Sequence, residues 1–211
     1  ITGLGETRIK INYTAYLVDD WESIFEKHVF LLKYSGLYGD CEQFNIFYYP
    51  SNERLVSLIK EYGIQDKTRL FEQNMNKFEA PAIDDLIRNP LDVNLYFHTK
   101  GVSVKSNKKT YVPSLYWNDY MSYFNICRYR DCLDMLNKAD MCGVELEPNK
   151  KPNVGFMYCG NFWWSTGKHL ADIRNSEKYQ DFLKSNDRYI CENIMCSIPG
   201  KYAELYNSMS N

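Results

Sequence analysis

The residue types best suited to chemistry lie together in the stretch 93–101, which reads V-N-L-Y-F-H-T-K-G. Its first part alternates residues on two faces and is rich in β-branched and aromatic side chains, which predicts a strand. The strand ends in His98, Thr99 and Lys100, so an imidazole, a hydroxyl and an ammonium group arrive at one point. Ligands of open α/β sheets bind outside the carboxyl ends of the strands. We therefore interpret this end as a ligand site; the alternative is a strand that stops in polar residues at a surface turn.

The composition is that of a globular protein with a full core. Hydrophobic residues make up 45% of the 211 residues, and the net charge of -2 argues against a general nucleic-acid binder, which carries a basic excess. No apolar run reaches the roughly 18 residues that span a bilayer. Seven scattered cysteines without a C-x-x-C pair favour reduced thiols over a zinc site or a disulfide framework. These features predict a cytoplasmic protein, and the lack of an initiator Met predicts a piece of a longer chain with further domains.

The elements that must position this strand end alternate along the first half of the chain. We expect strands at 9–18 and 43–49, and helices at 21–34, 51–62 and 81–89. Asp20 and Ser51 are the expected N-caps of the first two helices, and Gly63 ends the second. The sequence of residues 65–78 is polar and does not indicate a helix or a strand. This β-α-β-α order predicts a mostly parallel sheet with right-handed crossovers, as in nucleotide-binding α/β proteins.

The second half has a different character. We expect helices at 114–138, 166–173, 177–185 and 188–196, and strands at 141–146 and 155–158. Between them, residues 160–165 read G-N-F-W-W-S. A Trp face and the amide of Asn161 suit the C–H faces and hydroxyls of a sugar, so one of Trp163 and Trp164 is expected to face a cleft. The alternative is that these aromatic residues belong to the core. At least one of Phe162, Trp163 and Trp164 is expected there, because three neighbouring side chains cannot all face one cleft.

Familiar catalytic motifs are absent. The sequence has no G-x-x-x-x-G-K-[ST] phosphate loop, no G-x-S-x-G elbow and no G-x-G-x-x-G. With three histidines, a purely histidine-based metal site is not expected, and His28 is interpreted as a surface or boundary residue of its helix.

An ordered set of motifs nevertheless resembles a known family. L-Y-F-H-T-K-G-V-S is followed by W-N-D-Y-M-S-Y-F, G-N-F-W-W-S and D-R-Y-I-C-E-N, and S-G-L-Y precedes them. Together they resemble viral and bacterial sugar-nucleotide glycosyltransferases of the GT-A type, most closely those that build chlorella virus capsid glycans. The resemblance covers nearly the whole chain. It implies one GT-A-like domain over 1–211, with a Rossmann-like, mixed but mostly parallel sheet flanked by helices.

The resemblance also implies a UDP-sugar donor and a divalent cation, usually Mn²⁺. Most such enzymes hold the metal with Asp-x-Asp after the central strand, and this sequence contains no Asp-x-Asp. His98, Thr99 and Lys100 occupy the corresponding place. His98 can ligate Mn²⁺ through its imidazole, and Lys100 can neutralise phosphate directly. The absence of Asp-x-Asp puts metal ligation in doubt, but it does not change the expected position of the diphosphate.

Further site residues follow from the same resemblance. The nucleoside is assigned to Thr14, Ala15 and Tyr16, and the sugar and acceptor to Asn161 with Trp163 or Trp164. Asp119 is a candidate for donor hydroxyls or the metal, with a solvated helix-face carboxylate as the alternative. Glu192 and Asp187 are candidates for the acid near the anomeric carbon, with ordinary acids of a helix N-terminus as the alternative.

The sequence-based hypothesis is therefore a glycosyltransferase that moves a hexose or deoxyhexose from a UDP-sugar to a glycan hydroxyl, with a capsid glycoprotein as the implied acceptor. Residues 1–104 would bind the nucleotide sugar, and 105–211 the sugar and acceptor. If the chain is viral, it acts in the host-cell cytoplasm. The rival hypotheses are a non-catalytic carbohydrate- or nucleotide-binding module, and a sugar-nucleotide hydrolase or nucleotidyltransferase.

Overall fold

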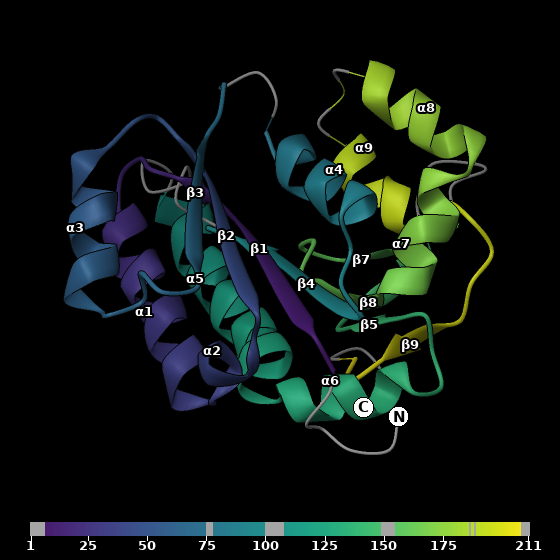
Figure 1. Ribbon diagram of the computed structural model, residues 1–211, viewed down its shortest axis with the longest axis horizontal. Helices are drawn as coiled ribbons and strands as arrows, with labels where there is room; N and C mark the ends of the chain where they lie inside the picture. Colours follow the sequence, from purple (N-terminus) through teal and green to yellow (C-terminus); the bar gives the residue numbers. More distant parts are fainter. Residues whose placement is uncertain are drawn as a thin grey trace.

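A seven-stranded mixed sheet organises the computed structural model, which describes residues 7–74, 78–99, 108–148, 155–185, 187 and 189–207 (Figure 1). In spatial order its strands are β3 (Thr68–Glu72), β2 (Gln43–Tyr49), β1 (Ile9–Tyr16), β4 (Val93–His98), β8 (Trp163–Thr166), β5 (Met141–Gly143) and β9 (Tyr202–Glu204). The first four run parallel, whereas β8 is antiparallel to both β4 and β5. A separate two-stranded sheet pairs β6 (Leu146–Pro148) with β7 (Phe156–Tyr158). The predicted mixed, mostly parallel α/β sheet is confirmed.

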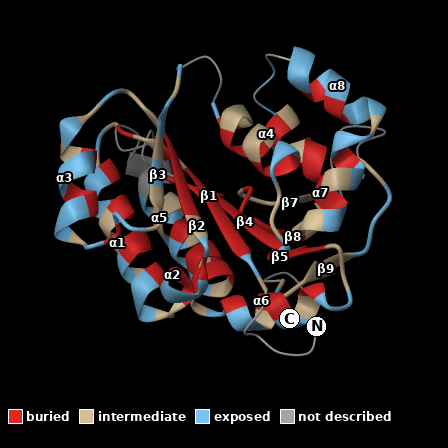
Figure 2. Cartoon of the chain, in the orientation of Figure 1, coloured by how far each residue is buried: buried red, intermediate tan, exposed pale blue. Residues whose placement is uncertain are grey.

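Helices cover both faces of the sheet (Figure 1). The core on one face is built with α1 (Trp21–Tyr34), α2 (Leu37–Asp40), α3 (Glu53–Glu61), α5 (Lys108–Ser122) and α6 (Tyr129–Leu136). The core on the other face is built with α4 (Ala80–Arg88), α7 (Gly167–Arg174), α8 (Glu177–Lys184) and α9 (Ile190–Asn193). The inner strands β1, β4, β8 and β5 are mostly buried between them, whereas the edge strands β3 and β9 are partly exposed (Figure 2). No helix in the described ranges is both long and apolar enough to cross a bilayer.

The first half of the chain largely follows its sequence pattern. The helix predicted at 21–34 is α1, and Gly63 adopts the positive φ of a helix C-terminus. The predicted caps are wrong in detail: Asn52, rather than Ser51, accepts the hydrogen bond that caps α3, and the Asp20 side chain makes no capping bond. Strand β3 lies in the segment that the sequence left ambiguous, because an edge strand with half-exposed residues carries a weak hydrophobic pattern.

The second half departs further from expectation. The helix predicted at 114–138 is interrupted by a π-helical turn, Tyr123–Cys127. This turn leaves the carbonyl of Asn125 to accept a hydrogen bond from the Trp164 indole, at 2.9 Å. Trp164 itself lies in β8, so residues 163–166 form a buried strand rather than a loop. The sheet is continuous from β1–β4 into β8, β5 and β9, and so joins the two halves of the chain.

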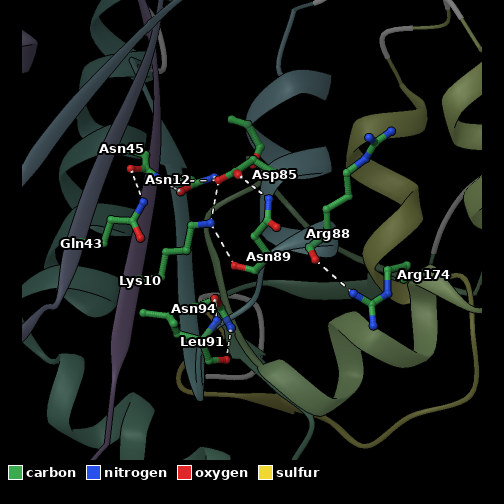
Figure 3. A network of polar contacts seen from close by, with 11 residues as sticks. Lys10, Asn12, Gln43, Asn45, Asp85, Arg88, Asn89, Leu91, Asn94 and Arg174 are labelled. Carbon is green, nitrogen blue, oxygen red and sulfur yellow. Dashed lines mark hydrogen bonds and ion pairs between the residues drawn. The ribbon is translucent and has the colours of Figure 1, made fainter.

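One face of β1 carries polar residues that are buried beneath α4 (Figure 3). Lys10 is 2% exposed and places its ammonium group 2.7 Å from a carboxylate oxygen of Asp85. Asn12 donates to the same carboxylate at 2.9 Å, and Asn45 donates to the Asn12 side chain at 3.0 Å. Lys10 also donates to the carbonyl oxygen of Asn89. The network therefore ties β1 and β2 to α4, the helix that begins beside the end of β4.

The charge state of Asp85 follows from these bonds. Burial raises the pKa of the carboxyl, but hydrogen bonds from Lys10, Asn12 and Asn89 and the charge of Lys10 outweigh burial, and the net pKa lies below the usual value. A lowered folded-state pKa stabilises the fold above the unfolded-state pKa of about 4 and loses that effect as the pH falls through the folded value.

We predict that Lys10→Met lowers the free energy of unfolding by about 3 kcal/mol. This is the lower end of the range for breaking a buried ion pair, because Asp85 keeps 23% of its side chain exposed. Arg8→Met is the matched control, because Arg8 pairs with Asp92 at the surface and its loss should change stability little. Urea unfolding at pH 7 and below pH 4 measures both. A Lys10→Met loss that does not shrink in acid would contradict the assigned role of Asp85.

Candidate functional site

The end of β4 brings together a histidine and a glutamate that are distant in sequence. His98 is the last residue of β4, and Glu79 directly precedes α4. His98 Nδ1 lies 2.8 Å from Glu79 Oε1, and the two side chains are only 8% and 11% exposed. An ionised carboxylate can only accept a hydrogen bond, so Nδ1 carries the hydrogen. The contact fixes the orientation of the ring and directs Nε2 away from Glu79.

The other ring nitrogen of His98 has no partner among the described residues. His98 Nε2 is buried and makes no hydrogen bond. A buried polar atom without a hydrogen bond costs about 1–3 kcal/mol, so such atoms are rare. The expected ligand site at the end of β4 therefore includes a nitrogen that is in place to bind an atom from outside the fold.

Asn161 holds the same glutamate from the opposite side. Its Nδ2 lies 2.5 Å from Glu79 Oε2, and its Oδ1 accepts from the Trp163 indole at 2.8 Å. Asn161 is 2% exposed, so its amide faces Glu79 and Trp163 rather than a sugar. The preceding Gly160 has φ 87°, and a Cβ there would come within 2.2 Å of the Met121 sulfur. This close approach to α5 requires glycine.

The two tryptophans lie on opposite faces of β8 because successive strand residues alternate. Trp163 is 1% exposed and packs against Tyr96, whereas Trp164 is 0% exposed and bonds the carbonyl of Asn125. The prediction that one of them faces a cleft is therefore wrong, and both belong to the core.

The ends of β1 and β4 are joined by side-chain hydrogen bonds. The Thr99 hydroxyl accepts from the backbone amide of Tyr16 at 2.9 Å, and Tyr96 donates to the Thr14 hydroxyl at 3.1 Å. Ala15 is buried on the α1 face, which leaves Tyr16 as the partly exposed residue of the predicted nucleoside set with a large side chain. Its ring stacks on Tyr49 at the end of β2, with ring centroids 6.2 Å apart. Lys100 lies outside the described residues.

His28 is buried, which contradicts the surface position predicted for it. Its Nδ1 contacts the Tyr13 hydroxyl at 3.1 Å, and its Nε2 contacts Asn118 and Ser122 at 3.1 Å. Burial and the charge of Lys27 lower the pKa of His28 to about 3, so its ring is neutral at pH 7. Tyr13 lies in β1, and Asn118 and Ser122 in α5, so His28 links the sheet to α5 through α1.

The predicted acids are not brought to His98 by any observed contact. Asp119 pairs with Lys27 at 2.5 Å and is 57% exposed, which matches the alternative of a solvated helix-face carboxylate. Asp187 accepts from the Tyr189 amide at 2.9 Å at the turn before α9. Glu192, in α9, adds with Glu145 and Glu147 to the negative surroundings of Cys159. Burial above all, and then these charges, raise the pKa of that thiol to about 11.

The Mn²⁺ implied by the sequence resemblance does not fit the ligands near His98. Within the described residues, no group of three or more His, Cys, Asp or Glu side chains could hold a metal ion. Glu79, the carboxylate beside His98, is occupied by the other imidazole nitrogen and by Asn161. The remaining residues of the chain include one acid, Glu6, and no His or Cys. No step of the reaction proposed below therefore uses a metal ion.

Comparison with known proteins supports the fold. No protein-family model matches the chain, and no curated protein matches it. A structure of HddC from Yersinia pseudotuberculosis matches with a TM-score of 0.53 at 10% identity, over 94% of this chain and 90% of HddC. HddC complexed with GMP-PN matches at 0.52 with 9% identity and the same coverage. A 4-diphosphocytidyl-2C-methyl-D-erythritol synthase from Anaerococcus prevotii matches at 0.48 with 10% identity, over 94% and 87%.

At these identities the likeness concerns the fold alone. The chain shares with HddC an α/β fold, in which helices cover both faces of a mixed, mostly parallel sheet. Glu79 is the site residue that sequence reasoning missed. It stands between a segment of ambiguous secondary structure and a helix that begins with Ala80-Pro81, and nothing in its local pattern distinguishes it from an ordinary acid at a helix N-terminus.

We predict that Trp163→Ala and Trp164→Ala each lower the free energy of unfolding by about 3–5 kcal/mol, because each removes a buried aromatic side chain and leaves a cavity. Tyr116→Ala is the control, since Tyr116 is 71% exposed and surface changes fall within about 0.5 kcal/mol. Urea unfolding of the three variants tests this. Near-native stability of either Trp variant would restore the cleft-facing interpretation for that residue.

Proposed function

We propose that the chain is a glycosyltransferase that moves a hexose or deoxyhexose from a UDP-sugar to a hydroxyl of a growing glycan. The acceptor is a glycan on a protein, and the sequence resemblance makes a viral capsid glycoprotein the specific proposal. The proposed location is the cytoplasm, which suits seven free cysteines. Residues 1–104 would hold the donor, and the sugar and acceptor would lie against residues 105–211.

The observation that carries the proposal is the pair of strand ends at β1 and β4. Tyr16 and Thr99 are tied there by a hydrogen bond, and His98 carries a buried nitrogen without a partner. Nucleotides bind at this edge of open α/β sheets. HddC, which shares the fold, was solved with GMP-PN, and this supports a nucleotide as the ligand.

The proposed reaction breaks the bond between the anomeric carbon and the diphosphate oxygen. The acceptor oxygen bonds to that carbon and passes its proton to a carboxylate near the anomeric carbon, and UDP leaves with the bonding electrons. Hydrogen-bond donors must stabilise the charge on the leaving diphosphate, and the proposed donors are His98, Thr99 and Lys100. Glu192 is retained as the acid near the anomeric carbon. Asp187 and Asp119 are weaker proposals, because they have partners in local turns or at the surface.

We predict that UDP is released from UDP-sugars only when a glycan acceptor is present. Transfer needs a nucleophilic hydroxyl, so a panel of UDP-sugars assayed with and without acceptor separates the alternatives. Release without acceptor indicates a hydrolase, and binding without release indicates a non-catalytic module. Pyrophosphate formed from a nucleoside triphosphate and a sugar phosphate indicates a nucleotidyltransferase.

We predict that Lys100→Ala weakens UDP binding by about 1.5–3 kcal/mol, the scale of a hydrogen bond to a charged group, with nearly unchanged melting temperature. Calorimetric titration with UDP and thermal unfolding measure the two quantities. Normal UDP affinity together with a markedly lower melting temperature would assign this lysine to the fold instead.

A further inference from the structure

A row of aromatic rings runs along α5 and its π-helical continuation. Trp117 stacks on Tyr120, with ring centroids 5.4 Å apart, and Tyr120 meets Phe124 edge-on at 5.2 Å. Phe124 stacks in turn on Tyr206 at 5.2 Å, with the two rings 8° from parallel. We call these four residues the aromatic row. The first three come from the run W-N-D-Y-M-S-Y-F, in which the proposed function gives a role to Asp119 alone.

The aromatic row is partly open to solvent. Its three members on α5 and the π-helical turn are half-buried against the core, and Tyr206 is 39% exposed. The other tryptophans of the chain, Trp21, Trp163 and Trp164, are at most 4% exposed. Trp117 is therefore the tryptophan that a solute can reach.

One end of the aromatic row lies at the candidate site. A Cβ on Gly160 would come within 2.7 Å of the Trp117 indole nitrogen, so this ring packs over the residue that precedes Asn161. Asn161 in turn bonds Glu79, which holds His98. The row is thus continuous with the strand end that the proposed function assigns to the donor.

The sheet places the other end of the aromatic row on the same edge as His98. Strand β8 is antiparallel to both β4 and β5, and β9 is parallel to β5, so β4, β5 and β9 end at one edge. The pairings align Tyr96 of β4 with Glu204 of β9, and His98 and Tyr206 each lie two residues further along. Three strand spacings, about 14 Å, separate these two positions. The row therefore extends from the site over more than one sugar ring.

Polar groups lie beside the rings. The Tyr120 hydroxyl donates to Glu145 at 2.6 Å, and the Asn207 amide donates to Glu204 at 3.1 Å. Burial above all, then the hydrogen bond to Glu145 and nearby charges that include Glu204, raise the pKa of the Tyr120 hydroxyl, so it stays neutral. Sugars offer C–H faces to aromatic rings and hydroxyls to carboxylates and amides. Because carboxylates repel anionic sugars, these groups suit a neutral glycan.

We propose that the aromatic row binds the acceptor glycan, a neutral oligosaccharide whose reacting end points toward Gly160 and whose further sugars extend toward Tyr206. The inference rests on the proposed function, which assigns the acceptor only to the range 105–211. Trp117 is the contact nearest the reacting sugar. Tyr206 contacts a sugar further along the glycan.

Binding is tested on an array of defined neutral and anionic glycans, from monosaccharides to hexasaccharides, with UDP present. Wild type should bind at least one neutral oligosaccharide, and Tyr206→Leu should bind it about tenfold more weakly. Leucine keeps an apolar contact with Phe124 but lacks a flat ring. Tyr206→Phe keeps the ring and should retain the affinity. Tyr116→Leu is the matched control, because Tyr116 is 71% exposed on α5 and lies outside the aromatic row.

Glycan length separates a sugar contact from damage to the fold. The ratio of oligosaccharide affinity to the affinity for the monosaccharide of its reacting end should fall about tenfold in Tyr206→Leu. A distorted fold would weaken both and leave the ratio unchanged. In the transfer assay, the same variant should raise the KM for the oligosaccharide, the sign of lost acceptor binding. A second measurement needs no variant: the bound oligosaccharide should protect the fluorescence of wild-type Trp117 from iodide quenching.

Several outcomes overturn the inference. If no array glycan binds, or if Tyr206→Leu binds oligosaccharides as wild type does, the aromatic row is not the acceptor site. UDP release with a monosaccharide acceptor would then leave the proposed function intact. A wild-type dimer in sedimentation velocity that Tyr206→Leu disrupts, with glycan binding unchanged, would make the row a contact between two copies of the chain. Glycan binding on the row without UDP release from any UDP-sugar would support this inference and overturn the proposed function.

Discussion

Strand β4 is the constraint around which the molecule is arranged. All six of its residues are buried, and it pairs with parallel β1 on one side and antiparallel β8 on the other. It therefore marks the boundary between the parallel and mixed parts of the sheet. Alternation along β4 sends Leu95 and Phe97 to one core and Tyr96 to the other. The strand then delivers His98 to the edge of the sheet where ligands of such folds bind.

Many buried polar side chains form hydrogen-bond networks between the sheet and the helices that cover its two faces. Lys10, Asn12 and Asn45 are bonded to Asp85 beneath α4, and His28 is bonded to Tyr13, Asn118 and Ser122 beneath α5. Burial of these polar groups costs little free energy because each donor is hydrogen-bonded to an acceptor. Among the described residues, two buried side-chain atoms have no hydrogen-bond partner, namely Nε2 of His98 at the end of β4 and Oδ1 of Asn125 in the π-helical turn. Only the His98 atom lies at a strand end, where ligands of open α/β sheets bind.

The sequence predicted the parts of the fold that local pattern controls. The helix at 21–34 and the strands at 43–49 and 93–98 have strong periodicity, and they form where expected. Strand β8 was missed because two adjacent tryptophans and a glycine resemble a binding loop. A strand between two others buries both of its faces and loses the alternation that would reveal it. His28 was misplaced because its partners come from β1 and α5, which lie far from it in sequence.

For a related reason, the sequence predicted only part of the candidate site. His98 could be recognised from its own strand, whereas Glu79 and Asn161 reach it from other elements that lie 19 residues before and 63 residues after it. The pairing of Tyr96 with Trp163 sets where β8 begins, and this places Asn161 just beyond that strand, against Glu79. Gly160 allows the turn that brings it there, because a larger residue would strike Met121. The orientation of the imidazole is therefore set by the register of β8 and the start of α4, neither of which the H-T-K-G run can reveal.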